Sequence, residues 1–201
     1  MGTREQKSIE TTNKIILAAK TILASRGYPK TTISAVAESA GVSRGLLHYH
    51  FKSKEDMLAK VLSNSVQEIS ESLDELFANC ATAEECIDAL VFSIRSLIEQ
   101  DSALLTILIE GSAASKDSQL IRDALYNEYK SFHAMLRQHF SKLLPETPLS
   151  GGKSIDSLVT VIIGIADGIG LQFSVMPELA RDENNWAGIR YSMLALIEAY
   201  K

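Results

Sequence analysis

Six residues whose side chains or backbone could contact a nucleic acid lie within one stretch of eight positions. Hydroxyl, guanidinium and imidazole groups donate hydrogen bonds to phosphate oxygens and to base edges, and a glycine lets the backbone approach a duplex closely. These candidates for contact with double-stranded DNA are Ser43, Arg44, Gly45, His48, Tyr49 and His50.

Other groupings in the chain could suggest catalysis, but none has the required spacing. Gly152-Lys153-Ser154 resembles the end of a phosphate-binding loop, yet Thr147 stands where the first glycine is needed. The glycines between positions 164 and 170 do not fit the dinucleotide-binding pattern, and the two pairs of histidines are not spaced as in zinc enzymes. The sequence therefore predicts a protein that is not an enzyme, with no metal and no cofactor.

The six candidate DNA-binding residues fall on a predicted helix-turn-helix. Thr32 can cap a short helix with apolar residues at positions 33, 36, 37 and 40, and Gly41 can supply the sharp turn. Ser43 can cap a second helix of barely two turns, in which Leu47 and Phe51 are available for packing. In this arrangement the second helix enters the major groove of DNA.

Two longer helices flank this motif. Apolar residues from Ile15 to Leu23 recur at helical spacing, and the pattern stops at Gly27 with Pro29 just beyond. After the motif, Ser53-Lys54-Glu55-Asp56 matches a capping box, and apolar residues continue at helical spacing to Phe77.

Charge is distributed unevenly along the chain. The formal net charge is −5, but residues 1–60 hold ten basic and five acidic residues, whereas the remaining 141 hold ten basic and 20 acidic residues. A basic head suits a polyanion, and an acidic body would stay away from it.

The segment from Ile16 to Leu62 resembles the amino-terminal domain of TetR-family transcriptional regulators. The matching features are RGY after the first helix, the Thr pair before the second, AGVS at the turn, a basic residue and glycine in the recognition helix, and HF before a Ser-Lys-Glu helix start. The resemblance implies a homodimeric regulator, most often a repressor, whose nine-helix subunit joins a three-helix DNA-binding head to a ligand-binding body.

Several DNA contacts are implied position by position. Residues where relatives touch DNA are Thr32, Ser43, Arg44, Gly45, Tyr49, His50 and Lys54. His48 stands where the family motif usually has tyrosine, so either His48 or Tyr49 would make that phosphate contact. Leu46 would touch a thymine methyl group or simply pack.

The rest of the chain is also predicted to be helical, giving an all-α protein of about nine helices. Thr82-Ala83-Glu84-Glu85 opens one helix, Asp101 and Asp117 are candidate caps of two more, and prolines and glycines between 145 and 152 form a loop. Two helices follow, at about 154–176 and 185–200. We expect a DNA-binding domain at 1–60 and a ligand-binding and dimerisation domain at 61–201.

The first of these last two helices is apolar nearly all round. The run from Leu158 to Met176 is long enough to cross a bilayer, but Asp167 and three glycines interrupt it, so we predict a buried helix and no membrane partner. The resemblance implies that the two carboxy-terminal helices pair with their copies in a four-helix bundle.

An apolar cavity for a small, largely apolar effector is expected in the body. The candidate lining residues are Phe92, Leu108, Tyr126, Tyr129, His133, Asp167 and Phe173. The alternative is that the aromatic residues are ordinary core, that His133 is satisfied or exposed, and that Asp167 bonds to a neighbouring helix or to its dimer mate.

The overall composition sets the cellular context. The chain has 201 residues, of which 46% are hydrophobic and 22% charged, with a polar amino terminus and two cysteines. These features predict a cytoplasmic protein without a disulfide scaffold or secretory signal. The alternative function is a helical protein–protein interaction module that does not bind DNA, and steeply salt-dependent retention on heparin would argue against it.

Overall fold

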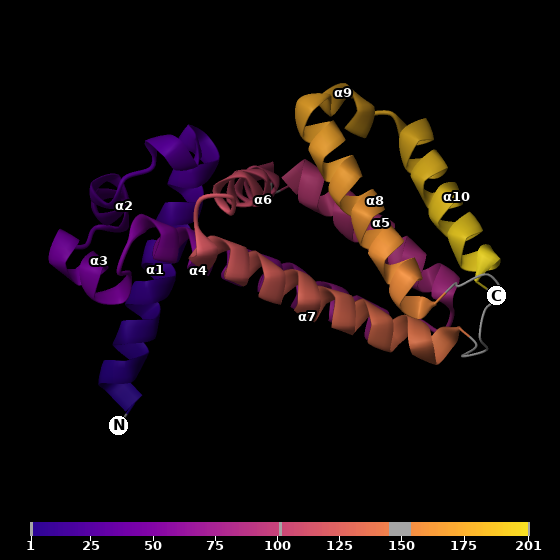
Figure 1. Ribbon diagram of the computed structural model, residues 1–201, viewed down its shortest axis with the longest axis horizontal. Helices are drawn as coiled ribbons and strands as arrows, with labels where there is room; N and C mark the ends of the chain where they lie inside the picture. Colours follow the sequence, from indigo (N-terminus) through magenta and orange to yellow (C-terminus); the bar gives the residue numbers. More distant parts are fainter. Residues whose placement is uncertain (1, 101, 145–153, 201) are drawn as a thin grey trace. The chain divides into compact units, whose positions relative to one another are not determined.

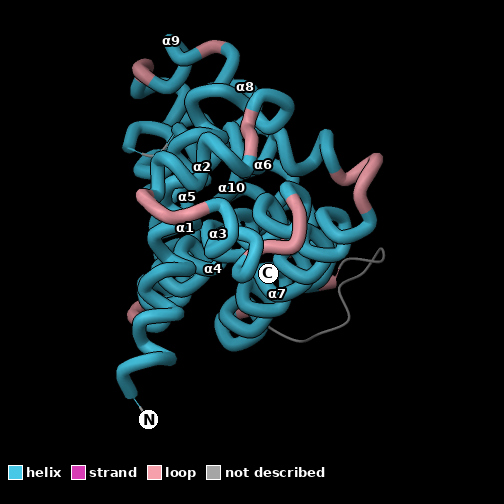
Figure 2. Tube along the Cα trace, turned by 90° about the vertical axis from the view of Figure 1, so that its left-hand side faces the viewer, coloured by secondary structure: helices cyan, strands magenta, loops and turns pink. Residues whose placement is uncertain are grey.

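The computed structural model describes residues 2–100, 102–144 and 154–200, and every element in these ranges is a helix (Figure 1). Short loops join the helices that follow one another within each of these ranges (Figure 2). The all-α fold class is confirmed. The helices are α1 (Gly2–Lys30), α2 (Ile33–Ala40), α3 (Arg44–His50), α4 (Lys54–Ala78), α5 (Ala83–Gln100), α6 (Ser102–Ala114), α7 (Gln119–Leu143), α8 (Ile155–Val175), α9 (Pro177–Ala180) and α10 (Glu183–Ala199).

The chain forms two compact units whose boundaries fall inside α4, α6 and α7. Unit 1 comprises residues 1–66 and 106–127, and unit 2 comprises residues 67–105 and 128–201. The functional division at residue 60 stays a prediction.

Unit 1 contains the helix-turn-helix and has its own apolar core. From α1 come Ile15, Ala19 and Leu23, which are almost fully buried, as are Leu47 and Phe51 beyond the turn. Side chains from α2, from the first half of α4 and from residues 107, 121 and 125 complete this core. The core fixes α2 and α3 against α1, because removing these side chains from water is the main favourable term in packing short helices.

The first helix contains a sharp kink instead of ending. Gly27 has φ 75° and ψ 164°, and helical geometry resumes up to Lys30. The positive φ explains the glycine, and Pro29 is tolerated because it stands in the first turn after the kink, where no helical N–H is needed. The helical pattern thus predicts the position of the backbone break, Gly27, correctly. One more helical turn follows the break, up to Lys30.

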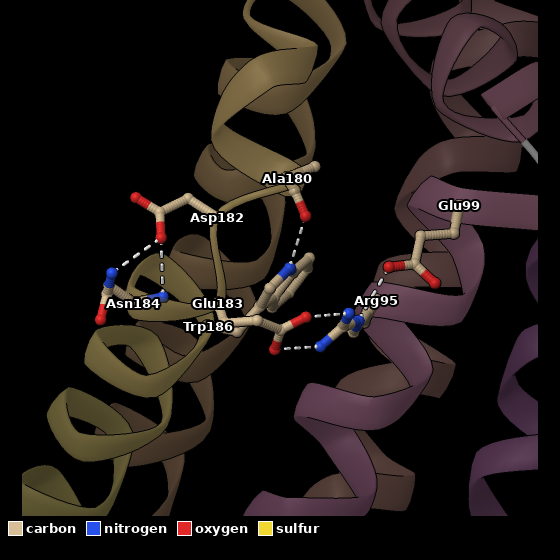
Figure 3. A network of polar contacts seen from close by, with 7 residues as sticks. All are labelled: Arg95, Glu99, Ala180, Asp182, Glu183, Asn184 and Trp186. Carbon is tan, nitrogen blue, oxygen red and sulfur yellow. Dashed lines mark hydrogen bonds and ion pairs between the residues drawn. The ribbon is translucent and has the colours of Figure 1, made fainter.

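Unit 2 is built around α5, α8 and α10, with the adjoining parts of α4 and α7. Its core includes Phe77, Phe140, Ile162 and Met193, each almost fully buried. Trp186 donates its indole N–H to the Ala180 carbonyl at 2.8 Å. Beside it, Arg95 of α5 bonds to Glu183 at the start of α10 and to Glu99 (Figure 3).

Two details of the helix ends differ from the sequence-based expectations. The predicted cap Asp117 is wrong, since α7 begins at Gln119 and the Ser118 hydroxyl accepts from the Ile121 N–H at 3.4 Å. The short helix α9, which Pro177 starts, was not predicted. The candidate cap Asp101 and the loop at 145–152 lie outside the described residues.

Helix α8 is, among the described helices, the one long and apolar enough to cross a membrane by length and composition. A third of its most apolar stretch is buried within this subunit. Such a helix is also found in the core or interface of soluble proteins, so its composition alone does not assign it to a membrane.

Candidate DNA-binding surface and ligand pocket

Polar caps and one glycine position the recognition helix α3. Gly41 has φ 63°, and its N–H bonds back to the Ala37 and Glu38 carbonyls to close α2. The Ser43 side chain accepts from the Leu46 N–H at 3.1 Å, and the Thr32 side chain accepts from the Ala35 N–H at 3.2 Å. Because both hydroxyls act as acceptors in these caps, each keeps its O–H to donate outward.

Helix α3 is attached to its unit through one fully buried side chain. Leu47 has no exposed surface, while the Leu46 side chain is 40% and the Tyr49 side chain 80% exposed. The other exposed residues of α3 and its cap are Ser43, Arg44, Gly45 and His48. The helix therefore presents its polar residues to solvent, as a groove-reading helix must.

Two further predicted DNA contacts have partners inside unit 1. His50 is half-buried, and its Nδ1 lies 2.9 Å from the Thr12 hydroxyl of α1. The Lys54 ammonium donates to the Pro29 carbonyl at 3.2 Å and lies 4.2 Å from the centre of the Tyr28 ring. The His50 ring and the Lys54 ammonium are therefore fixed by contacts within unit 1.

The residues that hold Lys54 were missed in the sequence. The Tyr28 hydroxyl donates to Glu55 Oε1 at 3.2 Å, and burial together with this carboxylate raises the pKa of Tyr28 to about 12. The RGYP stretch after the first helix was visible as a motif, but its contact with α4 depends on residues 25 positions apart.

Replacing Lys54 by alanine is expected to weaken binding of all DNA sequences about equally. The predicted phosphate contact of Lys54 would be lost, so the slope of log affinity against log salt should fall by about one. Titrations at several salt concentrations measure this slope. Lys116→Ala, which removes an exposed cation of unit 1 outside the helix-turn-helix, should leave it unchanged.

Five of the predicted ligand-binding residues lie in unit 2. The Tyr129 hydroxyl donates to Asp167 Oδ2 at 2.9 Å, and His133 Nε2 lies 3.3 Å from both the Asp156 carbonyl and the Thr160 hydroxyl. Phe173 is buried, with its ring edge-on to Trp186, and Phe92 is 63% exposed.

The Tyr129–Asp167 pair is partly shielded from water by neighbouring protein atoms. Although the Asp167 side chain is exposed, neighbouring protein atoms raise the pKa of its carboxyl, and the hydrogen bond from Tyr129 partly opposes that shift. Desolvation, followed by the Asp167 charge, raises the pKa of Tyr129. The contact agrees with the alternative that Asp167 bonds to a neighbouring helix.

The other two predicted lining residues belong to unit 1. Leu108 packs against the core of that unit, and Tyr126 is 65% exposed. Two open hollows of about 330 and 320 Å³ lie between α4 and α7 in unit 2, around Asp74 and Gln138. None of the seven predicted residues lines either hollow in the part of the chain that the structure describes.

Comparison with known proteins agrees with the geometry of α2 and α3. Residues 15–61 match the family model of bacterial regulatory proteins of the tetR family. The helix-turn-helix type transcriptional regulator TtgR of Pseudomonas putida is 23% identical over 209 residues, which cover 98% of this chain and 97% of that protein. Residues 15–61 therefore form a segment of the tetR type, and the proteins that resemble this chain over its whole length are transcriptional regulators, not enzymes.

Two further comparisons are with regulators from Bacillus subtilis. The fatty acid metabolism regulator protein of Bacillus subtilis is 31% identical over 94 residues, which cover 47% of this chain and about half, 48%, of that relative's length. The structure of the transcriptional regulator FadR from Bacillus subtilis in complex with stearoyl-CoA has the same fold, with a TM-score of 0.76, 22% identity and coverage of 94% and 98%.

Proposed function

We propose that this regulator is a cytoplasmic repressor that binds a palindromic DNA operator as a homodimer and is released by a small, largely apolar effector. The observation that carries the proposal is the exposed face of α3, which turns Arg44 and its polar neighbours outward while Leu47 alone is buried. The DNA-binding domain would comprise residues 1–60, and the ligand-binding and dimerisation domain residues 61–201.

Replacing Arg44 by alanine is expected to lower operator affinity by about 1–3 kcal/mol, because a guanidinium in the major groove reads guanine through two hydrogen bonds. The test first selects a tight-binding duplex from a random pool and then measures binding of both proteins to it. Lys116→Ala is the matched charge control. Equal affinity of the Arg44 variant and wild type would mean that α3 does not read bases.

A stripe of exposed apolar and small residues on α8 supports the homodimer. Val161, Leu171 and Val175 are exposed apolar residues at spacings that place them on one helix face. Gly164 and Gly168 lie between them, and a Cβ at either would meet nothing within 4 Å. A second α8 could approach this stripe closely, and the exposed Tyr191 of α10 would extend the contact.

Leu171→Glu is expected to convert the dimer into a monomer, since it places a charge in the centre of a desolvated interface. Sedimentation velocity at micromolar concentration reports the state directly. Leu120→Glu, the same change at another exposed leucine, should remain dimeric. A wild-type protein that sediments as a monomer would refute the proposed assembly.

The effector is proposed to contact the five predicted residues of unit 2, which are Phe92, Tyr129, His133, Asp167 and Phe173. The Tyr129–Asp167 pair and His133 would provide the polar contacts to an otherwise apolar molecule. Because the related FadR binds stearoyl-CoA, that molecule is the first probe, with free coenzyme A as control. Stearoyl-CoA should raise the melting temperature and release the selected duplex; no effect of it would exclude this long-chain class.

A further inference from the structure

We propose that Thr12 of α1 positions His50 for its DNA contact, and that DNA binding takes up a proton on the His50 ring. This inference rests on the proposed function, since it concerns how α3 holds a phosphate. Thr12 lies before residues 15–61, the segment that matches the family model.

The Thr12 hydroxyl fixes one edge of the imidazole. Its Oγ1 lies 2.9 Å from His50 Nδ1 across 38 residues of sequence, and both side chains are half-buried. No hydrogen bond to Nε2 occurs among the residues whose side chains the structure describes, and no fully buried side-chain nitrogen there lacks a partner, so at least part of Nε2 is accessible to solvent. The exposed Tyr49 ring stands edge-on to the imidazole at 5.3 Å. The ring is thus held at Nδ1, and Nε2 remains accessible.

Counting the hydrogens at this contact shows which form of His50 can bind phosphate. Thr12 has one hydroxyl hydrogen, and its Oγ1 also lies 3.0 Å from the Ser8 carbonyl, to which it donates. If Thr12 donates to Ser8, Nδ1 must carry a hydrogen, and a neutral ring then has a bare Nε2 that repels phosphate. If Thr12 donates to Nδ1 instead, the bond to Ser8 is lost.

Only the imidazolium form satisfies all three groups at once. Its Nδ1–H donates to Thr12, Thr12 donates to Ser8, and Nε2–H donates to a phosphate oxygen. A phosphate at Nε2 therefore favours proton uptake from solution, and affinity should fall as pH rises across the range in which histidine titrates.

The charged groups around His50 do not supply this proton or its counter-ion. The ammonium group of Lys60, in α4, donates a hydrogen bond to the His50 main-chain carbonyl at 3.3 Å and lies 3.8 Å from the Asp56 carboxylate. The neighbouring rings are Tyr49 of α3 and Phe51, the residue that caps its end. Among the residues whose side chains the structure describes, no carboxylate bonds to the imidazole, so the phosphate would be the first anionic partner found for it.

The test uses variants of one hydroxyl and a duplex of arbitrary sequence, about 30 base pairs long, at low salt, because a phosphate contact needs no particular sequence. At about pH 6, Thr12→Val should lower affinity about three- to tenfold, and Thr12→Ser should restore it. Thr11→Val is the control, since the Thr11 hydroxyl bonds to the Lys7 carbonyl of its own helix. Thermal unfolding confirms that each variant is folded.

Two further measurements separate proton uptake from a merely structural role. The affinity of the wild-type protein should fall between about pH 6 and about pH 8. His50→Gln should make this fall smaller, whereas His48→Gln should keep the part of the fall that depends on His50. At neutral pH, the NMR resonance of the His50 ring should move toward its imidazolium position when duplex is added.

Equal affinities of the Thr12→Val and Thr11→Val variants, or a His50 ring that stays neutral in the complex, would overturn this inference alone. Failure of the wild-type protein to bind any duplex would instead overturn the proposed function.

Discussion

Replacing Phe140 by alanine should lower the free energy of unfolding by about 3–5 kcal/mol, because it removes a whole aromatic ring from a closed core. Phe140 has no exposed surface, and its ring stands edge-on to Phe77 at 6.0 Å. Leu136 of α7 and Leu144, the residue after α7, belong to the same core, so the cavity cannot fill without moving several side chains.

Chemical denaturation followed by circular dichroism measures this loss for the Phe140 variant. Phe92→Ala is the matched control, since it deletes the same ring from a position that is 63% exposed, and it should change stability by no more than about 0.5 kcal/mol. Equal effects of the two substitutions would show that α7 does not pack in unit 2 as described.

Leu47→Ala should cost about 2–5 kcal/mol of stability and also weaken DNA binding, because Leu47 is the one fully buried side chain within α3. The helix has only seven residues, too few to be stable without tertiary contacts. Loss of this contact should therefore free the recognition helix from α1 and α2 before the rest of unit 1 unfolds.

The adjacent residue provides the control for Leu47. Leu46→Ala makes the same change at a side chain that is 40% exposed, and its effect on stability should stay within about 0.5 kcal/mol. Denaturant titration combined with amide hydrogen exchange of residues 43–51 distinguishes the Leu47 variant from the Leu46 variant. A stable α3 in the Leu47 variant would contradict the packing described for unit 1.

The helix-turn-helix could be predicted because its signals are local. Thr32, Gly41 and Ser43 each act within four residues, through a cap or a positive φ, and the structure places all three in those conformations. The capping residues Ser53 and Thr82 also act locally, each accepting from the backbone N–H three residues later.

What the sequence could not show depends on contacts between distant residues. Thr12 meets His50 across 38 positions, and Tyr129 meets Asp167 across the same interval, so neither pair has a sequence pattern. The predicted lining residues share only helical spacing and residue type, and the structure distributes them over both units. Asp117 failed as a cap because Ser118 is an equally good capping residue one position later.

The central claim, that the exposed face of α3 lies against DNA, can be tested by hydroxyl-radical footprinting with and without the selected duplex. Tyr49 is 80% exposed and Tyr126 is 65% exposed, so both react readily in the free protein. Our account predicts that duplex protects Tyr49 severalfold and leaves Tyr126 unchanged. Unaltered oxidation of Tyr49 under saturating duplex would contradict it.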